Sequence, residues 1–220
     1  TAKMLATIDV LSKGRVTVGV GVGWMREEFE ALGAPDFDKR GASSNEYLEI
    51  FKKCWTQDPV SHQGEFYSFK ELRCVPHPVQ KPHPPIWVGG HSRPALRRVA
   101  KYGDGWLPYM YTPEHLANSI EKIKAFGEEL GTDLSDFTFA IYIFSAVHED
   151  NDTAVKYAAE RLSKQYAQDF SQLVHKYALA GDPDKCKARL QEYIDAGASA
   201  VFVSSACPDD YIDTNLEMLA

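Results

Sequence analysis

The stretch from Pro84 to Pro108 reads PPIWVGGHSRPALRRVAKYGDGWLP and decides the fold class. Its apolar runs, Pro85–Gly90 and Gly105–Pro108, predict strands, because continuous apolar character is typical of strands buried on both faces of a parallel sheet. Between them, residues 92–102 predict a helix, with Ser92 as its N-cap and Pro94 in its first turn. Together they predict a strand–helix–strand segment of an α/β fold.

The same alternation continues on both sides of this stretch. Further strands are predicted at Arg15–Gly23, Phe137–Val147 and Ala198–Ser204. Further helices are predicted at Asn45–Trp55, Pro113–Leu130, Asp152–Tyr166 and Pro183–Ala196, with a short helical pattern after Asp209. Five strands are counted in this way, whereas a closed barrel needs eight. From the pattern alone, an open doubly wound sheet fits equally well.

Residues 60–85 break the alternation with aromatics, a glycine turn and prolines. This segment predicts a β-hairpin or insertion at the rim of the fold, followed by an extended proline-rich approach to the next strand. There is no internal repeat, so residues 1–220 are expected to form one domain.

Composition excludes several classes of function. The chain has 220 residues, 44% hydrophobic and 25% charged, with 24 basic and 31 acidic residues and a net charge of −7. An acidic chain without a basic run is a poor nucleic-acid binder. No apolar run has transmembrane length. The four cysteines form no CxxC pair, so we expect no metal site and reduced thiols in a cytoplasmic protein.

Gly19, Gly21 and Gly23, followed by Trp24, form the first glycine cluster. The spacing GxGxG differs from the dinucleotide fingerprint GxGxxG, so a Rossmann site is disfavoured. Two interpretations remain open. The glycines allow close packing of a strand, or Gly21 and Gly23 leave room for a flat ring beside Trp24.

Val88, Gly89, Gly90, His91 and Ser92 form the second cluster, where a predicted strand ends and a helix begins. Two glycines allow close approach of a ligand to the backbone, and the first N–H groups of a helix attract anions. Nearby arginines add positive charge. We favour an anion site, with phosphate as the ligand, over a tight turn in which Ser92 is only a cap.

Other polar residues carry weaker signals. Asp104 fits a turn better than a contact with a neighbouring loop. Arg40 either pairs with Glu46, closing a loop, or is a solvated surface arginine. The remaining histidines, including His62, lack metal-ligand spacing and are assigned no role. No nucleophile or acid–base set can be identified, so the catalytic residues stay unassigned.

Several blocks, in order and spacing, resemble the luciferase-like monooxygenase family, and within it the branch of coenzyme F-420 (deazaflavin)-dependent oxidoreductases. These blocks are GVGVGWMREEFEALGAPDFDKRG (19–41), EYLEIFKKCWT (46–56), PVSHQGEFYSF (59–69) and PVQKPHPPIWVGGHSRPALRRVAKYGDGWLP (78–108). The resemblance implies a (β/α)8 TIM barrel. Residues 1–15 resemble the helix before the family's fourth strand, so the first three strands are expected to be absent from this chain.

The resemblance also implies a cofactor site at the carboxyl ends of the strands. In the family, the loop matching 88–92 holds the cofactor's phosphate, the loop matching 107–108 approaches it, and the strand end matching 22–24 borders the ring. The implied cofactor-binding residues are Val22, Gly23, Trp24, Val88, Gly89, Gly90, His91, Ser92, Leu107 and Pro108. Sugar-phosphate dehydrogenases of the family have a glutamate where Trp24 stands, and Trp24 cannot act as an acid.

The expected function is therefore hydride transfer between coenzyme F-420 and a small organic substrate. The alternatives are a monooxygenase that uses reduced FMN, and a shortened, non-catalytic flavin-binding chain. The family's polar residues near the ring, on its second strand, would lie in the absent part. Family members often form dimers, so a homodimer is expected.

Overall fold

The computed structural model describes residues 1–219, and its contacts divide the chain into two compact units. Unit 1 contains residues 1–105 and 123–137, and unit 2 contains residues 106–122 and those from Thr138 onward. Strand β5 (Gly105–Trp106) and helix α5 (Pro113–Leu130) each contribute residues to both units. The expectation of one domain over residues 1–220 stays a prediction.

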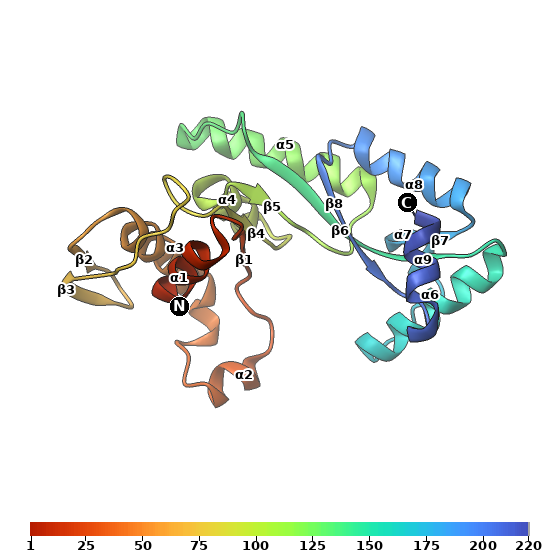
Figure 1. Ribbon diagram of the computed structural model, residues 1–220, viewed down its shortest axis with the longest axis horizontal. Helices are drawn as coiled ribbons and strands as arrows, with labels where there is room; N and C mark the ends of the chain where they lie inside the picture. The colour runs from red at the N-terminus through yellow and green to blue at the C-terminus, as the bar shows by residue number, and fades with distance from the viewer. Residues whose placement is uncertain (220) are drawn as a thin grey trace. The chain divides into compact units, whose positions relative to one another are not determined.

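Unit 1 is built on a pair of parallel strands, β1 (Val18–Val20) and β4 (Ile86–Val88), in which Val18 pairs with Ile86 and Val20 with Val88. Its helical elements are α1 (Ala2–Ser12), α2 (Arg26–Ala31), the 3-10 helix η1 (Phe37–Lys39), α3 (Arg40–Thr56) and α4 (Arg93–Tyr102). Helix α3 packs against α1 and α4 (Figure 1).

The segment that breaks the strand–helix alternation contains an antiparallel pair, β2 (Val60–Gln63) and β3 (Ser68–Leu72). Burial alternates along β2, with Val60 and His62 inside. Val60 packs with Cys54 of α3 and Cys74, so the inner face of the hairpin has a small apolar core.

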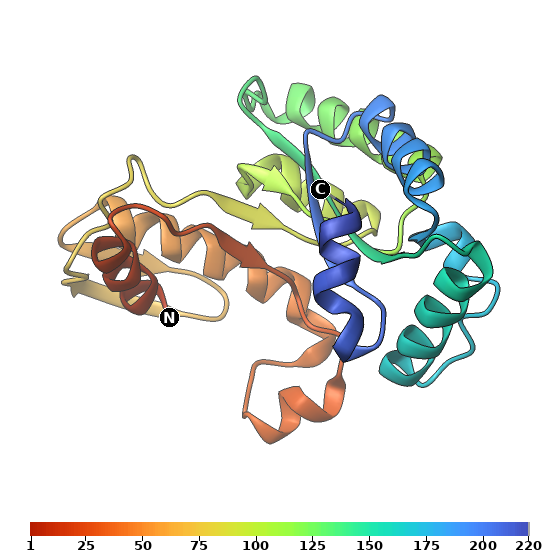
Figure 2. The same cartoon turned by 45° about the vertical axis from the view of Figure 1, so that its right-hand side comes forward.

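Unit 2 centres on the long strand β6 (Thr138–Val147), which pairs in parallel with β7 (Ala178–Gly181) and β8 (Ala200–Ser205). Its other elements are α6 (Asn151–Tyr166), α7 (Val174–Tyr177), α8 (Pro183–Asp195), η2 (Asp209–Tyr211) and α9 (Ile212–Leu219). Both α6 and α9 contact β6 (Figure 2). Phe144 and Ala146 of β6 pack with Leu162 of α6 in the core.

Asn215 of α9 connects the carboxyl ends of β6 and β8. It is fully buried, and its Oδ1 accepts a hydrogen bond from the Val147 backbone N–H at 2.7 Å. Its Nδ2 donates to Ser145 Oγ at 3.1 Å and Ser205 Oγ at 2.9 Å. One amide side chain thus ties the last helix to two parallel strands.

The structure confirms the α/β class and the five predicted strands, with shorter bounds. It also contains β7, which the sequence analysis missed, so the count of five strands was too low. The sequence of β7 is ALAG, and alanine and glycine have low strand propensity. The short helices α2, η1 and α7 were missed for a similar reason, because such lengths show too little periodicity.

All four cysteines are free and buried, and the cytoplasmic location expected from reduced thiols stays a prediction. No helix within residues 1–219 is long and apolar enough to cross a membrane.

Candidate functional site

In unit 1 the two glycine clusters leave the sheet side by side. Strands β1 and β4 are parallel, so their carboxyl ends lie at the same edge. The Gly89 N–H donates to the Val20 carbonyl at 2.8 Å, which joins the two strand ends directly. The structure therefore brings together loop 21–24 and loop 89–92, which lie far apart in the sequence.

The first loop is held in place by Gly23 and Arg40. Gly23 has φ +79°, and a Cβ there would lie 2.5 Å from Phe29 Cε2, so a side chain at this position would be strained and would displace the Phe29 ring. Arg40 Nε donates to the Gly23 carbonyl at 3.2 Å, and its guanidinium lies 4.0 Å from the centre of the Phe37 ring. Arg40 is thus neither a solvated arginine nor the partner of Glu46, so the proposed Arg40–Glu46 ion pair was wrong.

Gly21 differs from Gly23, because a Cβ added at Gly21 would meet no atom within 4 Å. Packing within the protein therefore does not require glycine at this position. Gly21, Val22 and Gly23 border a pocket of about 350 Å³ whose other walls come from α2, α3 and the segment between them. Trp24 is 79% exposed and does not line this pocket.

The second loop joins β4 to helix α4. Val88 is buried at its start, whereas His91 and Ser92 are exposed. Gly90 has φ +108°, and a Cβ there would lie 2.9 Å from the Cβ of Ala95, so the loop lies close against the first turn of α4. Ser92 Oγ accepts from the Ala95 N–H at 3.3 Å, which confirms Ser92 as the N-cap.

The arginines of α4 serve the packing of the helix more than the loop. Arg97 forms an ion pair with Glu129 at 2.8 Å, and both Arg93 and Arg97 lie over the ring of Phe126. Arg98 is buried and donates to Asn45 Oδ1 at 2.6 Å and to the Gly41 carbonyl at 2.8 Å, holding α4 against α3. Arg97 and Arg98 therefore contact other parts of the protein, and they do not supply the positive charge that was expected around loop 89–92.

Leu107 and Pro108 follow β5 and belong to unit 2. Pro108 is buried and its carbonyl accepts from the Tyr142 N–H at 2.9 Å, so this segment is attached to β6. Its approach to a cofactor phosphate stays a prediction.

Two features of unit 1 bear on the flavin-type cofactor that the sequence resemblance implies. Gly89 and Gly90 have no side chain to keep a ligand away from the backbone. The Gly89 N–H is bonded to Val20, and in the first turn of α4 Pro94 has no N–H and the Ala95 N–H is bonded to Ser92. Gly21 leaves open space beside the neighbouring loop. Within residues 1–219 there is no group of three or more His, Cys, Asp or Glu residues suited to hold a metal ion.

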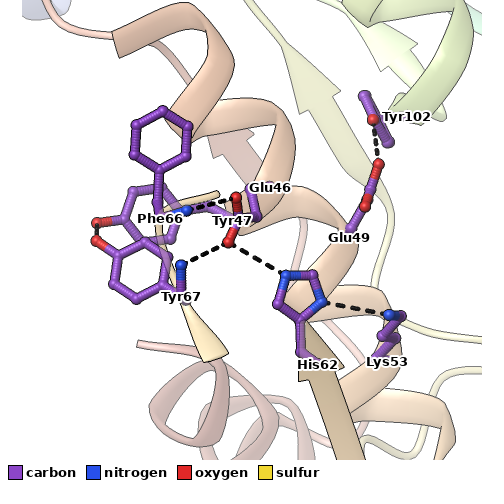
Figure 3. Close-up of polar contacts among 8 residues, drawn as sticks. All are labelled: Glu46, Tyr47, Glu49, Lys53, His62, Phe66, Tyr67 and Tyr102. Carbon is purple, nitrogen blue, oxygen red and sulfur yellow. Dashed lines mark hydrogen bonds and ion pairs between the residues drawn. The ribbon is translucent and has the colours of Figure 1, made fainter. Parts of the chain in front are cut away.

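Sequence reasoning missed the buried cluster around Glu46 (Figure 3). Glu46 accepts hydrogen bonds from the backbone N–H groups of Phe66 at 3.0 Å and Tyr67 at 2.7 Å, and His62 Nε2 lies 3.2 Å from its Oε1. Lys53 Nζ lies 3.2 Å from His62 Nδ1. An ammonium only donates, so Nδ1 accepts and Nε2 carries the hydrogen directed at Glu46.

This cluster fastens the hairpin to α3. Burial disfavours ionisation of Glu46, but the backbone donors of Phe66 and Tyr67, with His62, outweigh it and lower the pKa of the carboxyl. The hydroxyls of Tyr47 and Tyr67 also contact each other. The alternation of Val60 and His62 along β2 is the sequence signal that could have placed His62 inside.

Asp104 lies in the turn directly before β5, as the sequence analysis expected, and its side chain makes a further contact. Its Oδ2 accepts from the Ile86 N–H at 2.8 Å, and its own N–H donates to the Ile86 carbonyl at 2.7 Å. Asp104 thus also fixes the beginning of strand β4.

Comparison with known proteins agrees with the fold. Residues 1–200 match the luciferase-like monooxygenase family, and the chain belongs to that family. It is 40% identical over 126 residues to an FMNH(2)-dependent dimethylsulfone monooxygenase of Pseudomonas putida, covering 56% of this chain and 33% of that protein. It is 41% identical over 107 residues to an uncharacterised protein of Mycobacterium tuberculosis, and this match covers 48% of this chain and 37% of that protein. The matches thus span about a third of the curated relatives' length.

Solved structures share the fold at low sequence identity. An F420-dependent secondary alcohol dehydrogenase superimposes with a TM-score of 0.83 at 19% identity, covering 100% of this chain and 74% of the other. DmoA from Hyphomicrobium sulfonivorans superimposes with a TM-score of 0.74 at 18% identity, covering 96% of this chain and 62% of the other. The chain therefore has the fold of the luciferase-like oxidoreductases, which include F420-dependent and FMNH(2)-dependent enzymes.

Proposed function

We propose that this chain forms the cofactor-binding part of an oxidoreductase that acts on a small organic molecule. The observation that carries the proposal is the hydrogen bond from Gly89 to Val20, which sets two glycine loops at one edge of a parallel sheet. Two of the proteins named above support a flavin-type cofactor, since one is an FMNH(2)-dependent monooxygenase and one fold neighbour is an F420-dependent dehydrogenase.

Each loop has a separate role in the proposal. The loop 89–92 in front of α4 holds the phosphate, with the exposed His91 and Ser92 beside it, while the Gly89 N–H keeps its bond to Val20 and the Ala95 N–H its bond to Ser92. Gly21 and Val22 lie against the ring, and Arg40 keeps the loop rigid through the Gly23 carbonyl. When bound, the cofactor supplies a hydride or the electrons that activate dioxygen. The protein positions it and limits access of water.

Reduced FMN is the first candidate cofactor, because the match at 40% identity is to an FMNH(2)-dependent monooxygenase. A small, uncharged sulfone is the corresponding substrate, by analogy with that relative. Coenzyme F-420 is the second candidate, supported by the sequence blocks described above and by fold neighbours at 19% identity. The remaining sequence expectations, Trp24 at the ring, Leu107 and Pro108 at the phosphate, and a homodimer, stay parts of this proposal.

A titration tests the proposal. The purified chain is titrated with reduced FMN and with F-420, and cofactor fluorescence is recorded. Gly21→Ala adds a methyl group where the protein itself has room. If the ring occupies that space, overpacking of about 1–3 kcal/mol weakens binding roughly 5- to 150-fold.

Gly19→Ala is the matched control, since it also adds a methyl group into open space, but within β1. It should leave cofactor affinity unchanged. Tight binding of F-420 with weak binding of FMN would reverse the order of the candidates. Binding of neither cofactor, or equal affinity of Gly21→Ala and wild type, would contradict the proposed site.

A further inference from the structure

Two cysteines of unit 1 lie together in the small apolar core under the hairpin. Cys54 is in the last turn of α3, and Cys74 lies just after β3. With Val60 of β2 they form one cluster of buried side chains, in which Cys54 is 3% exposed and Cys74 is 4% exposed. Both thiols are free. The hairpin thus returns the chain to α3 and brings two thiols from separate elements into one core.

The ionisation of Cys54 shows that the two thiols are close neighbours. Burial, and after it the charge and the hydrogen bond of the Cys74 thiol, raises the pKa of Cys54 to about 11. A neighbouring group shifts a pKa in this way only at short range. The two sulfur atoms therefore form one site within the cluster.

A pocket of about 390 Å³ reaches this pair of thiols. Cys54 and Cys74 both line it, together with apolar and aromatic side chains of α3 and β3. Lys3 and Arg73 are the charged members of the lining. Hydrogen peroxide is small and uncharged, so it can enter such a pocket without the cost of removing a charge from water.

The other two cysteines provide a contrast within the same chain. Cys186 is 3% exposed and Cys207 is fully buried, and burial raises the pKa of both thiols. Their neighbours are charged groups, Asp182 beside Cys186 and Arg161 beside Cys207. Neither of them shares its surroundings with a second thiol in the part of the chain that the structure describes. Burial alone is therefore common to all four cysteines, whereas a thiol neighbour distinguishes the pair under the hairpin.

We propose that Cys54 and Cys74 are a redox pair, which hydrogen peroxide converts to a disulfide that fastens the hairpin to α3. The thiolate of one cysteine attacks a peroxide oxygen and becomes a sulfenic acid, and the other oxygen leaves as hydroxide. The second thiolate attacks the sulfenic sulfur, forms the S–S bond and expels a second hydroxide. The two sulfurs lose two electrons in total, and the two hydroxides take up the thiol protons, so that one peroxide becomes two molecules of water. A dithiol reductant reverses the change.

The disulfide adds a covalent connection where the reduced protein has only packing. It closes a ring of about 20 residues that contains the whole hairpin, and a ring of this size restricts the unfolded chain. For a chain of 220 residues, we expect the oxidised form to melt about 6–12 °C higher than the reduced form. The inference does not use loop 21–24 or loop 89–92, so it stands independently of the proposed cofactor.

The test uses the purified chain after full reduction. It is incubated with hydrogen peroxide, the free thiols are counted in denaturant, and disulfides are located by peptide mapping with mass spectrometry. We expect two of the four thiols to be lost, one disulfide to join Cys54 to Cys74, and dithiothreitol to restore all four thiols. Oxidation should be faster at pH 9 than at pH 7, since only the thiolate attacks peroxide.

Cys74→Ala and Cys186→Ala are matched variants, since each removes one buried thiol. Cys186→Ala should still form the disulfide and show the higher melting temperature after oxidation, whereas Cys74→Ala should show neither. If Cys74→Ala does not fold, the peptide map of the wild-type chain decides. A disulfide that includes Cys186 or Cys207, four thiols that survive peroxide at pH 9, or equal melting temperatures of oxidised and reduced wild type would overturn the inference.

Discussion

Replacing Glu46 by glutamine should destabilise the protein strongly although the two side chains have almost the same shape. Glu46 is 8% exposed and accepts hydrogen bonds from Phe66, Tyr67 and His62 with both of its oxygens. Glutamine has one acceptor oxygen and one NH2 group. If its oxygen serves Tyr67 and His62, its NH2 group faces the N–H of Phe66, and two donors then oppose each other.

The expected loss follows from this geometry. One buried donor without an acceptor costs about 1–3 kcal/mol, and the two remaining hydrogen bonds lose the assistance of the charge. We therefore expect Glu46→Gln to lower the free energy of unfolding by about 2–4 kcal/mol. Chemical denaturation followed by circular dichroism at pH 7 measures this change.

Glu49→Gln is the matched control on the same helix. The Glu49 carboxylate accepts from the Tyr102 hydroxyl at 2.5 Å (Figure 3). Its side chain, however, is 42% exposed. Glutamine can still accept this hydrogen bond, so a loss below about 1 kcal/mol is expected. A Glu46→Gln variant as stable as Glu49→Gln would refute the reasoning.

The pH dependence of stability gives a second measure of Glu46. The pKa of its carboxyl is lower in the folded state, so its contribution is present above the ordinary glutamate value of about 4.3 and is lost as the pH falls through the folded value. Wild type should lose this part of its stability on acidification, and Glu46→Gln should lack that component. Identical acid profiles of the two proteins would contradict a lowered pKa at this carboxyl.

Three further results are expected. Asn215→Ala should lower unfolding free energy by about 2–4 kcal/mol, because the buried Val147 N–H loses its acceptor; a loss below about 0.5 kcal/mol in denaturant melts would be inconsistent with that contact. Burial raises the pKa of Cys54 to about 11, so mass spectrometry should show slow alkylation of native protein by iodoacetamide at pH 8 and rapid alkylation in denaturant. Gly90→Ala should destabilise more than Gly131→Ala, since both have positive φ but only Gly90 lacks room for a Cβ; equal melting temperatures would argue against crowding at the loop.

Local sequence was sufficient wherever a short segment decides its own structure. The N-cap Ser92 and Pro94 in the first turn predicted α4 as it occurs, and the helix 113–130 was predicted with the observed bounds. The apolar run 137–147 predicted β6 almost to the residue. In each case hydrogen bonding and burial follow a repeat that is visible within a few turns or one strand.

Where the local sequence has only a weak preference, the structure of a segment depends on the groups that it meets in the folded protein. Strand β7, of sequence ALAG, exists because β6 offers a free edge at Phe144–Val147. Arg40 lies near Glu46 in sequence, yet it binds the Gly23 carbonyl, since the glutamate is taken by the hairpin backbone. Such choices depend on which groups meet after folding.

In the candidate site, too, some features follow from the local sequence and others only from the tertiary structure. The sequence by itself identified both glycine loops, because glycine pairs at the ends of apolar runs mark places where a backbone must bend sharply or be approached closely. Only the tertiary structure joined the two loops at one edge, through the pairing of β1 with β4. It alone brought the thiols of Cys54 and Cys74 into one core, since the contact between a helix and the segment after a hairpin is set by packing of the whole unit.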